Sequence, residues 1–263
     1  METQGQFEVG QASIMGIVDP NRHGLSRRLS EPLKRQIRKA CGFGCVVCGL
    51  AVCVYEHIDP LFAEATSHNP ESMALLCGSC HDKVTRHVWS KDKIAKARRN
   101  PKTFLKGYSQ EALDLTAPLD LRLGSSVVRD VKCIVRTNNG DEWFVVHPPE
   151  EPGGPARITV KFYGPDGKPE LSIVKNELQC RSDVWDFEFV GPTMTLRRGP
   201  RRIGLRLHAI PPRCLHLERL EMITNKHGIR IDPQGKATFL LGEAEITVSS
   251  SQLNASEAVF SIP

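Results

Sequence analysis

Cysteine, histidine and glutamate residues suited to metal chemistry lie between Cys45 and His81, in the stretch CVVCGLAVCVYEHIDPLFAEATSHNPESMALLCGSCH. One Cys-x-x-Cys pair opens this stretch, Cys45 and Cys48, and a second pair closes it, Cys77 and Cys80. The two-residue spacing lets a tight turn point both sulfur atoms at one ion, and four thiolates make the tetrahedral set that Zn²⁺ prefers. The alternative, four buried core cysteines, does not explain the paired spacing. We therefore predict one structural Zn²⁺ on these four residues, with no position open to a substrate.

The two cysteine pairs are 28 residues apart, which exceeds the usual gap in a zinc ribbon, so the clamp encloses further residues. Glu56 and His57 are the enclosed residues best suited to chemistry, and His81 follows the last cysteine directly. Residues 49–58 favour a strand, and alternation along a strand points Glu56 to one face and His57 to the other. A lone Glu-His pair on a strand is usually structural, whereas inside this cysteine frame the pair favours a catalytic role.

These residues resemble the HNH nuclease family in its four-cysteine, ββα-metal form, over about residues 30–100. The matching segments are Glu56-His57-Ile58 and the run SMALLCGSCH, from Ser72 to His81. The resemblance implies that His57 is a general base and that Glu56 and His81 hold one catalytic divalent ion, Mg²⁺ or another divalent metal. The Zn²⁺ on the cysteines would then be structural only.

Two positions depart from the family pattern. Glu56 stands where Asp or His is common, and Ser72 stands where the middle Asn of the family motif is expected. A Ser hydroxyl is shorter than an Asn amide and donates only one proton, so Asn69 is a second candidate for supporting the active-site loop. The departures motivate an alternative function, a catalytically degenerate zinc module that binds nucleic acid without cleaving it. A protein that uses its zinc domain only for assembly is a further alternative.

The charge of the chain is concentrated around the predicted metal sites. The net charge is +5, yet residues 20–107 carry sixteen Lys and Arg against seven Asp and Glu, whereas the remainder is slightly acidic. A basic region of this kind favours a nucleic-acid partner, with a solvated basic face as the alternative. We predict DNA contacts from a basic helix face and from the residues after His81, namely Lys34, Arg35, Arg38, Lys39, Lys83 and Arg86.

Local signals divide the chain into four segments. Residues 1–25 have no periodicity and are expected to form a tail, and residues 26–107 are expected to form the nuclease-like domain. Within that domain, Ser30 to Pro32 open a helix that continues over 33–40, and Ser90 and Pro101 bound a second helix over 90–100. Residues 108–120 are expected to be a linker with a short helical piece in the segment SQEALDL.

Short β-prone runs separated by turn residues fill residues 121–263, so we expect an α+β protein whose C-terminal domain is all-β. A sandwich, a jelly roll and a short β-solenoid all fit this pattern. The run KFYGPDGKPELSIVK is a hairpin signal. This half contains no catalytic constellation, and its charge is near neutral. A protein partner, self-association or regulation is its expected role.

Composition places the protein among soluble chains. No apolar run approaches the ~20 residues of a membrane span, and the N-terminus has no basic region followed by an apolar core. The cysteines outside the zinc pairs are expected to be small buried residues, which fits a reducing cytoplasm. Together, the sequence predicts a cytoplasmic, metal-dependent HNH-type endonuclease that hydrolyses DNA, with no membrane partner.

Overall fold

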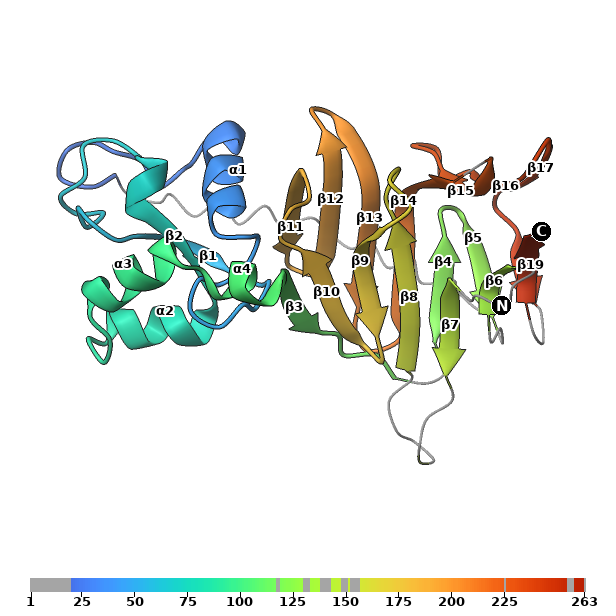
Figure 1. Ribbon diagram of the computed structural model, residues 1–263, viewed down its shortest axis with the longest axis horizontal. Coiled ribbons are helices and arrows are strands. Elements are labelled where there is room, and N and C mark those ends of the chain that lie inside the picture. Colours follow the sequence, from blue (N-terminus) through green and yellow to red (C-terminus); the bar gives the residue numbers. More distant parts are fainter. Residues whose placement is uncertain are drawn as a thin grey trace, which may run out of the picture.

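The computed structural model describes residues 20–116, 119–129, 133–137, 143–147, 151, 157–224, 226–254 and 258–262 (Figure 1). The fold mixes α and β structure and consists mostly of strands. Within this described part, all helices precede Gly107, so they lie at one end of the molecule and the two large sheets at the other (Figure 1). None of these helices is long and apolar enough to cross a membrane.

The N-terminal module, residues 26–107, is built around a two-stranded hairpin. Strand β1 pairs antiparallel with β2, and Glu56 lies opposite Ala74 while His57 lies opposite Met73. Ser90 caps its helix as predicted, because its hydroxyl accepts a hydrogen bond from the Lys93 amide. The elements are α1 (Glu31–Ala40), β1 (Val54–His57), η1 (Pro70–Ser72), β2 (Met73–Leu76), α2 (Gly78–Thr85), α3 (Lys91–Arg99) and α4 (Lys102–Lys106).

The β region, residues 108–262, contains a seven-stranded and a ten-stranded sheet. The first has the order β19-β6-β7-β8-β9-β10-β3. Its strands are β3 (Tyr108–Ala112), β6 (Cys133–Thr137), β7 (Phe144–His147), β8 (Arg157–Tyr163), β9 (Pro169–Val174), β10 (Glu177–Arg181) and β19 (Ala258–Ile262). The hairpin predicted between 161 and 175 is present as the antiparallel pair of β8 and β9.

The second sheet runs in the order β11 to β17, and β4, β5 and β18 join it through β14. Its strands are β4 (Asp120–Leu123), β5 (Ser126–Arg129), β11 (Asp186–Val190), β12 (Thr193–Gly199), β13 (Arg202–Ile210), β14 (Cys214–Thr224), β15 (His227–Ile231), β16 (Ala237–Leu241), β17 (Ala244–Val248) and β18 (Gln252–Asn254).

Both sheets are open, and they bury one core between them. Ile158 and Val160 of the seven-stranded sheet belong to the same buried cluster as Leu217 and Met222 of the ten-stranded sheet. Alternate residues along β8 are buried, which is the period of a strand with one face on a core. The two open sheets therefore share one buried core.

The segment 108–120 differs from the expected linker. Ser109 to Ala112, in the piece that was predicted to be helical, belong to strand β3, which pairs antiparallel with β10 at the edge of the seven-stranded sheet. Leu113 and Leu115 are both buried, and a spacing of two residues buries both side chains on one face of an extended chain. The short helical reading was wrong because core contacts from residues far along the chain outweighed local propensity.

The N-terminal module is joined to the β region by side-chain and backbone contacts. Phe43 is 2% exposed and packs in the core cluster of the β region. The backbone amide of Ala51 donates to the Gln110 carbonyl over 2.8 Å, and the Gln110 amide donates to the Gly49 carbonyl over 3.0 Å. The loop residues 49–51 of the module therefore extend the edge of the seven-stranded sheet by one short bridge, between Leu50 and Gln110.

A buried ion pair makes the second connection. Arg38 of α1 is 3% exposed, and its guanidinium donates to both carboxylate oxygens of Asp186, over 2.9 and 2.8 Å. Its third nitrogen donates to the Tyr55 hydroxyl and to Glu188, each over 2.9 Å. This bidentate geometry satisfies both charges at once, which a buried pair requires.

Candidate functional site

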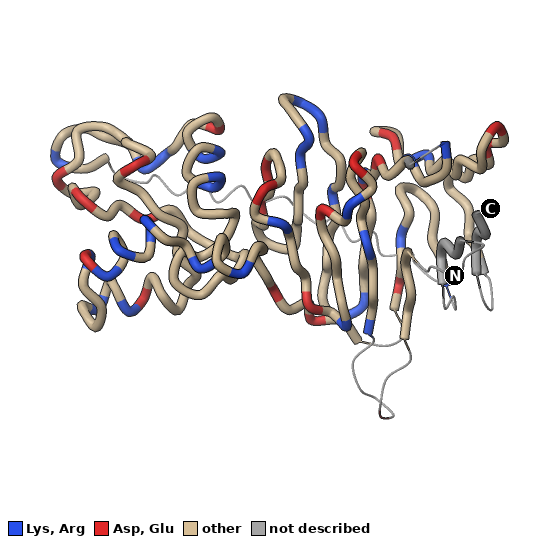
Figure 2. The backbone as a smooth tube through the Cα atoms, in the orientation of Figure 1, with Lys and Arg blue, Asp and Glu red and all other residues tan. Residues whose placement is uncertain are grey.

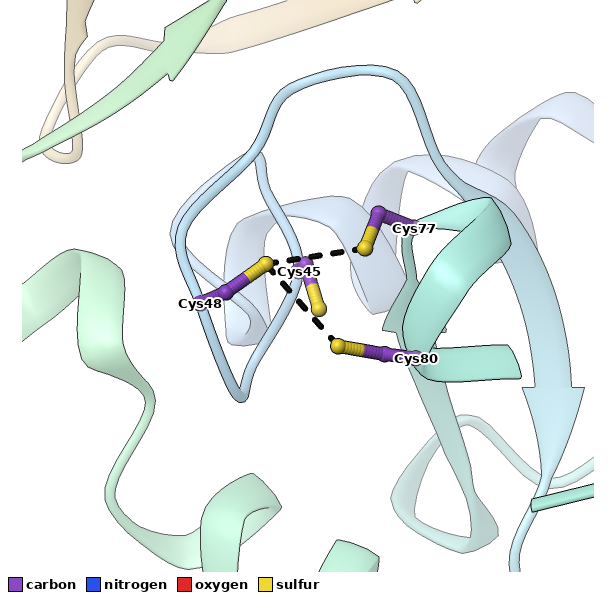
Figure 3. Close-up of side chains that lie close together, drawn as sticks. All are labelled: Cys45, Cys48, Cys77 and Cys80. Atoms are coloured by element: carbon purple, nitrogen blue, oxygen red, sulfur yellow. Dashed lines mark hydrogen bonds between the residues drawn. The ribbon is translucent and has the colours of Figure 1, made fainter. Parts of the chain in front are cut away.

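The four cysteines converge as the sequence predicted (Figure 3). Their sulfur atoms all lie within 4.8 Å of one another, and Cys48 Sγ is 3.5 Å from Cys77 Sγ. Gly49, at a φ of 88°, closes the turn after the first pair, and its amide donates to the Cys45 carbonyl over 2.8 Å. Cys77 is the residue before α2, and Cys80 lies in that helix.

The chemistry of these sulfur atoms fits a metal ion. A hydrogen bond from the Cys48 thiol lowers the pKa of Cys45 to about 5, whereas burial raises the pKa of Cys80 to about 12. Four thiolates this close together repel one another, and a divalent cation between them removes that repulsion. In the part of the chain that the structure describes, this is the only group of three or more Cys, His, Asp or Glu side chains placed to hold an ion.

Glu56 and His81 lie together beside this cluster. Glu56 Oε2 of β1 is 3.0 Å from His81 Nε2 in the first turn of α2. Lys91, at the start of α3, contacts the other Glu56 oxygen and donates to the His57 carbonyl over 2.6 Å. The two residues that the HNH resemblance assigns as metal ligands are thus adjacent, and an ammonium group balances the carboxylate charge.

His57 is 9% exposed and contacts a second histidine. Its Nε2 is 3.1 Å from His68 Nδ1, and His68 Nε2 is 2.7 Å from the Ser26 carbonyl. A carbonyl only accepts, so His68 Nε2 carries a proton and His68 Nδ1 accepts from His57. His57 Nδ1 is therefore the basic nitrogen. Burial, and then the nearby His68, lower the pKa of His57, which favours this neutral form.

His68 is a contact that the sequence did not reveal. His68 lies in the loop between β1 and β2 and occupies no position of the cysteine or Glu-His motifs. Its ring stacks at 11° against Phe62, with 6.5 Å between centroids, and Phe62 also contacts the His57 ring. The path of the loop brings these three rings together. No regular spacing of residues in the sequence predicts this contact.

The two loop-support candidates act in different ways. Asn69 Oδ1 accepts from the Glu71 amide over 3.0 Å and so begins η1. Ser72 contributes its backbone carbonyl, which accepts from the Ile58 amide over 2.8 Å. Asn69 therefore fixes the turn with its side chain, and Ser72 ties that turn to the end of β1.

The structure divides the predicted DNA-binding residues. The prediction for Arg38 is wrong, because this side chain is buried against Asp186 and cannot reach a phosphate. Arg35 lies with its guanidinium 3.7 Å from the Trp185 ring centre and donates to the Trp185 carbonyl. Lys34 is half-buried and pairs with Glu31, and the remaining predicted contacts are exposed, namely Lys39, Lys83 and Arg86.

Comparisons of the chain with protein-family models, with curated proteins and with solved structures found no match.

Proposed function

We propose that the N-terminal module is an HNH-type endonuclease that hydrolyses phosphodiester bonds of DNA. The observation that carries the proposal is the 3.0 Å approach of Glu56 Oε2 to His81 Nε2, with His57 adjacent in the same strand. These residues are 25 positions apart in the sequence, and the cysteine frame brings them together. A carboxylate, an imidazole ligand and an imidazole base are the groups that metal-assisted hydrolysis needs.

The Glu56 and His81 pair fits a divalent cation by its donor atoms. Mg²⁺ and similar ions bind through one or two protein groups and keep several waters, so two ligands suffice. When bound, such an ion stabilises the charge that develops on the phosphate. Lys91 currently balances the Glu56 carboxylate, so a divalent ion competes with this ammonium group for the same oxygens.

His57 would take a proton from the attacking water. Its Nδ1 is the free nitrogen because the proton on Nε2 is donated to His68. The lowered pKa keeps the imidazole neutral and able to accept a proton near neutral pH. His68 and the Ser26 carbonyl fix this tautomer, so they act as positioning groups.

The remaining parts of the proposal concern zinc, DNA and the β region. A Zn²⁺ on the four cysteines would hold the loop that carries Cys45 and Cys48 against the N-terminal end of α2 and take no part in the reaction. The eight cysteines whose side chains the structure describes are free thiols, which suits the reducing cytoplasm that we propose as the compartment. Figure 2 shows Lys and Arg along the helices of the module, in keeping with DNA binding. The β region would serve recruitment, regulation or self-association through a protein partner.

A second candidate function is DNA binding without cleavage. The observation that favours it is the contact between Lys91 and Glu56, because an ammonium group at this carboxylate disfavours a second cation. Ser72 in place of Asn supports the same alternative. The two candidates differ in whether divalent ions switch on hydrolysis.

A plasmid-nicking assay with Mg²⁺, Mn²⁺ or no added divalent ion separates them. We expect nicking by the zinc-loaded protein with one of the ions, and loss of nicking in His57→Asn with zinc content and DNA binding unchanged. The matched control is His87→Asn, an exposed position with a φ of 59° that Asn tolerates. Cleavage by His57→Asn at the wild-type rate contradicts the assignment of His57 as the catalytic base. If wild type cleaves with none of the ions, DNA binding without cleavage is the function that remains.

A further inference from the structure

A cavity of about 810 Å³ opens beside His57, at the junction of the N-terminal module and the β region. Its walls come from the segment 26–29, from α1, from strands β1, β2 and β11, and from the loop between β1 and β2. His57 and Met73 line it together with Val54 and Tyr55 of β1 and Glu188 and Val190 of β11. The cavity therefore includes the side chain that the proposed reaction uses as a base.

The walls of the cavity suit a flat apolar group. Val54 and Val190 are 45% and 64% exposed, which leaves two branched side chains open to solvent, one on β1 and one on β11. The aromatic rings of Tyr55 and Phe62 also line the cavity. Arg27 lies with its guanidinium 4.0 Å from the Phe62 ring centre, and such a plane stacks on nucleobases.

The charged groups around the cavity favour an anion. Arg27, Arg28 and Lys34 line it, and Lys34 also pairs with Glu31 over 2.9 Å. Glu188 is the one carboxylate among the lining residues that the structure describes. Its oxygens already contact Arg38 over 2.9 Å and Arg197 over 3.5 Å, so its charge is compensated. A ligand with a flat apolar part and a negative charge fits this combination.

We propose that the cavity binds one unpaired nucleotide of the DNA strand that is cleaved. The base would contact Val54 and Val190, and its phosphate would face the cations of segment 26–29. Volumes of this size are typical of sites that enclose a small ligand, whereas a paired base is held inside the duplex stack. The proposal rests on the nuclease function, and it makes β11 one wall of the substrate site.

The inference specifies the substrate class. A single strand, or a duplex with an unpaired nucleotide, presents a base at no unpairing cost, whereas a perfect duplex must first extrude one. The protein should therefore bind single-stranded and bulged DNA more tightly than a perfect duplex of the same sequence.

Fluorescence anisotropy with the full-length, zinc-loaded protein tests this, without added divalent ion so that no cleavage occurs. The three probes are a short single strand, its perfect duplex and the same duplex with one unpaired 2-aminopurine nucleotide. We expect at least about tenfold tighter binding of the first and third probes, because the perfect duplex must first unpair and extrude a base. The unpaired 2-aminopurine should also change its fluorescence on binding.

The variant Val190→Asp adds a charge to the cavity wall without touching the catalytic residues. It should weaken single-strand binding at least about tenfold. The control Val174→Asp adds the same charge at a residue that is 44% exposed on β9 and does not line the cavity. It should stay within about twofold of wild type, because surface substitutions away from a site have small effects.

The outcomes separate this inference from the nuclease proposal. Equal binding of perfect and bulged duplex, or equal effects of the two Asp variants, overturns the inference. A dimer that light scattering detects in wild type and that Val190→Asp dissociates also overturns the inference, because a second copy of the chain then occupies the cavity. Cleavage of perfect duplex with no preference for unpaired DNA leaves the nuclease function in place. Absence of binding to all three probes counts against both.

Discussion

The N-terminal module and the β region differ in the side chains that form their cores. In the module, the buried cluster contains Cys45, Cys77 and Cys80 beside Ile37 and Leu76, so residues that could hold a metal ion are part of a small core. In the β region, the buried cluster is made of aliphatic and aromatic side chains from two sheets. A small domain buries too little apolar surface to be stable alone, and a metal site makes up for this deficit.

The two regions also use their charged and polar side chains differently. In the module, Glu56 contacts His81 and Lys91 through side chains that are only partly buried, whereas His57 is 9% exposed. The β region uses its carboxylates for structure, since Asp186 and Glu188 bind Arg38. The contrast predicts that the two regions respond differently to metal loss, to loss of the buried ion pair, and to acid.

The largest expected effect is the loss of zinc. Cys77→Ser removes one of four thiolates, and we expect the N-terminal module to unfold while the β region stays folded. Structural zinc contributes roughly 10–16 kcal/mol in small metal-dependent domains, which exceeds the stability of a typical domain. Metal analysis should fall from about one zinc per chain to none, and proteolysis should digest residues before β3 first.

The matched control for zinc is Cys53→Ser. Cys53 Sγ lies outside the four-sulfur cluster and donates to the Leu50 carbonyl over 3.1 Å, a bond that a Ser hydroxyl can keep. This variant should retain zinc and protease resistance. If Cys77→Ser unfolds both regions together, the comparison between a metal-held and a sheet-held interior is wrong.

The next effect concerns the ion pair between the two regions. Arg38→Met leaves Asp186, which is 1% exposed, without its main partner, and breaking a buried pair in this way typically costs about 3–5 kcal/mol. Chemical denaturation should show this loss. The double variant Arg38→Met with Asp186→Leu should recover much of it, because both charges are then gone. The control is Lys34→Met, at a half-exposed ion pair, which should lower the free energy of unfolding by less than about 1 kcal/mol.

A smaller effect is expected at Lys91. Lys91→Ala removes the cation that contacts Glu56, so Mn²⁺ should bind the zinc-loaded protein about tenfold more tightly, because a hydrogen bond to a charged group is worth about 1.5–3 kcal/mol. Electron paramagnetic resonance of Mn²⁺ measures this without any substrate. The control is Lys93→Ala, whose ammonium lies over the Trp89 ring. Equal Mn²⁺ affinity in wild type and Lys91→Ala would show that the lysine does not compete with the ion.

Local patterns in the sequence accounted for part of this structure. The Cys-x-x-Cys spacing predicted the sulfur cluster, because the turn that joins each pair is set by adjacent residues. Ser90 and Pro101 predicted the bounds of α3 nearly to the residue, since a cap and a helix breaker act locally. The hairpin of β8 and β9 followed from its Gly-rich turn for the same reason.

The contacts that the sequence did not predict join residues far apart in the chain. Arg38 was placed on a solvent-facing side of its helix, but its partners Asp186 and Glu188 lie about 150 residues away. Charge and helical spacing alone do not distinguish a solvated arginine from a buried one. The contact of His57 with His68 depends on the path of a loop, and the pairing order of the two sheets depends on connections that no local pattern encodes.

The smallest expected effect is a pH dependence within the β region. His216 Nε2 is 3.0 Å from the Gly124 carbonyl, and burial lowers the pKa of His216 below its ordinary value of 6.5. Unfolding restores the ordinary pKa, so below pH 6.5 the unfolded chain binds more protons than the folded chain. The stability that neutral His216 contributes is therefore fully present above pH 6.5 and is lost as pH falls through the folded pKa.

The variant His216→Gln keeps a donor for the Gly124 carbonyl and does not titrate. The difference in unfolding free energy between pH 7.5 and pH 5.5, measured by denaturation of the β region, should be smaller in this variant than in wild type. An equal difference in both proteins would show that acid acts on the β region through other groups.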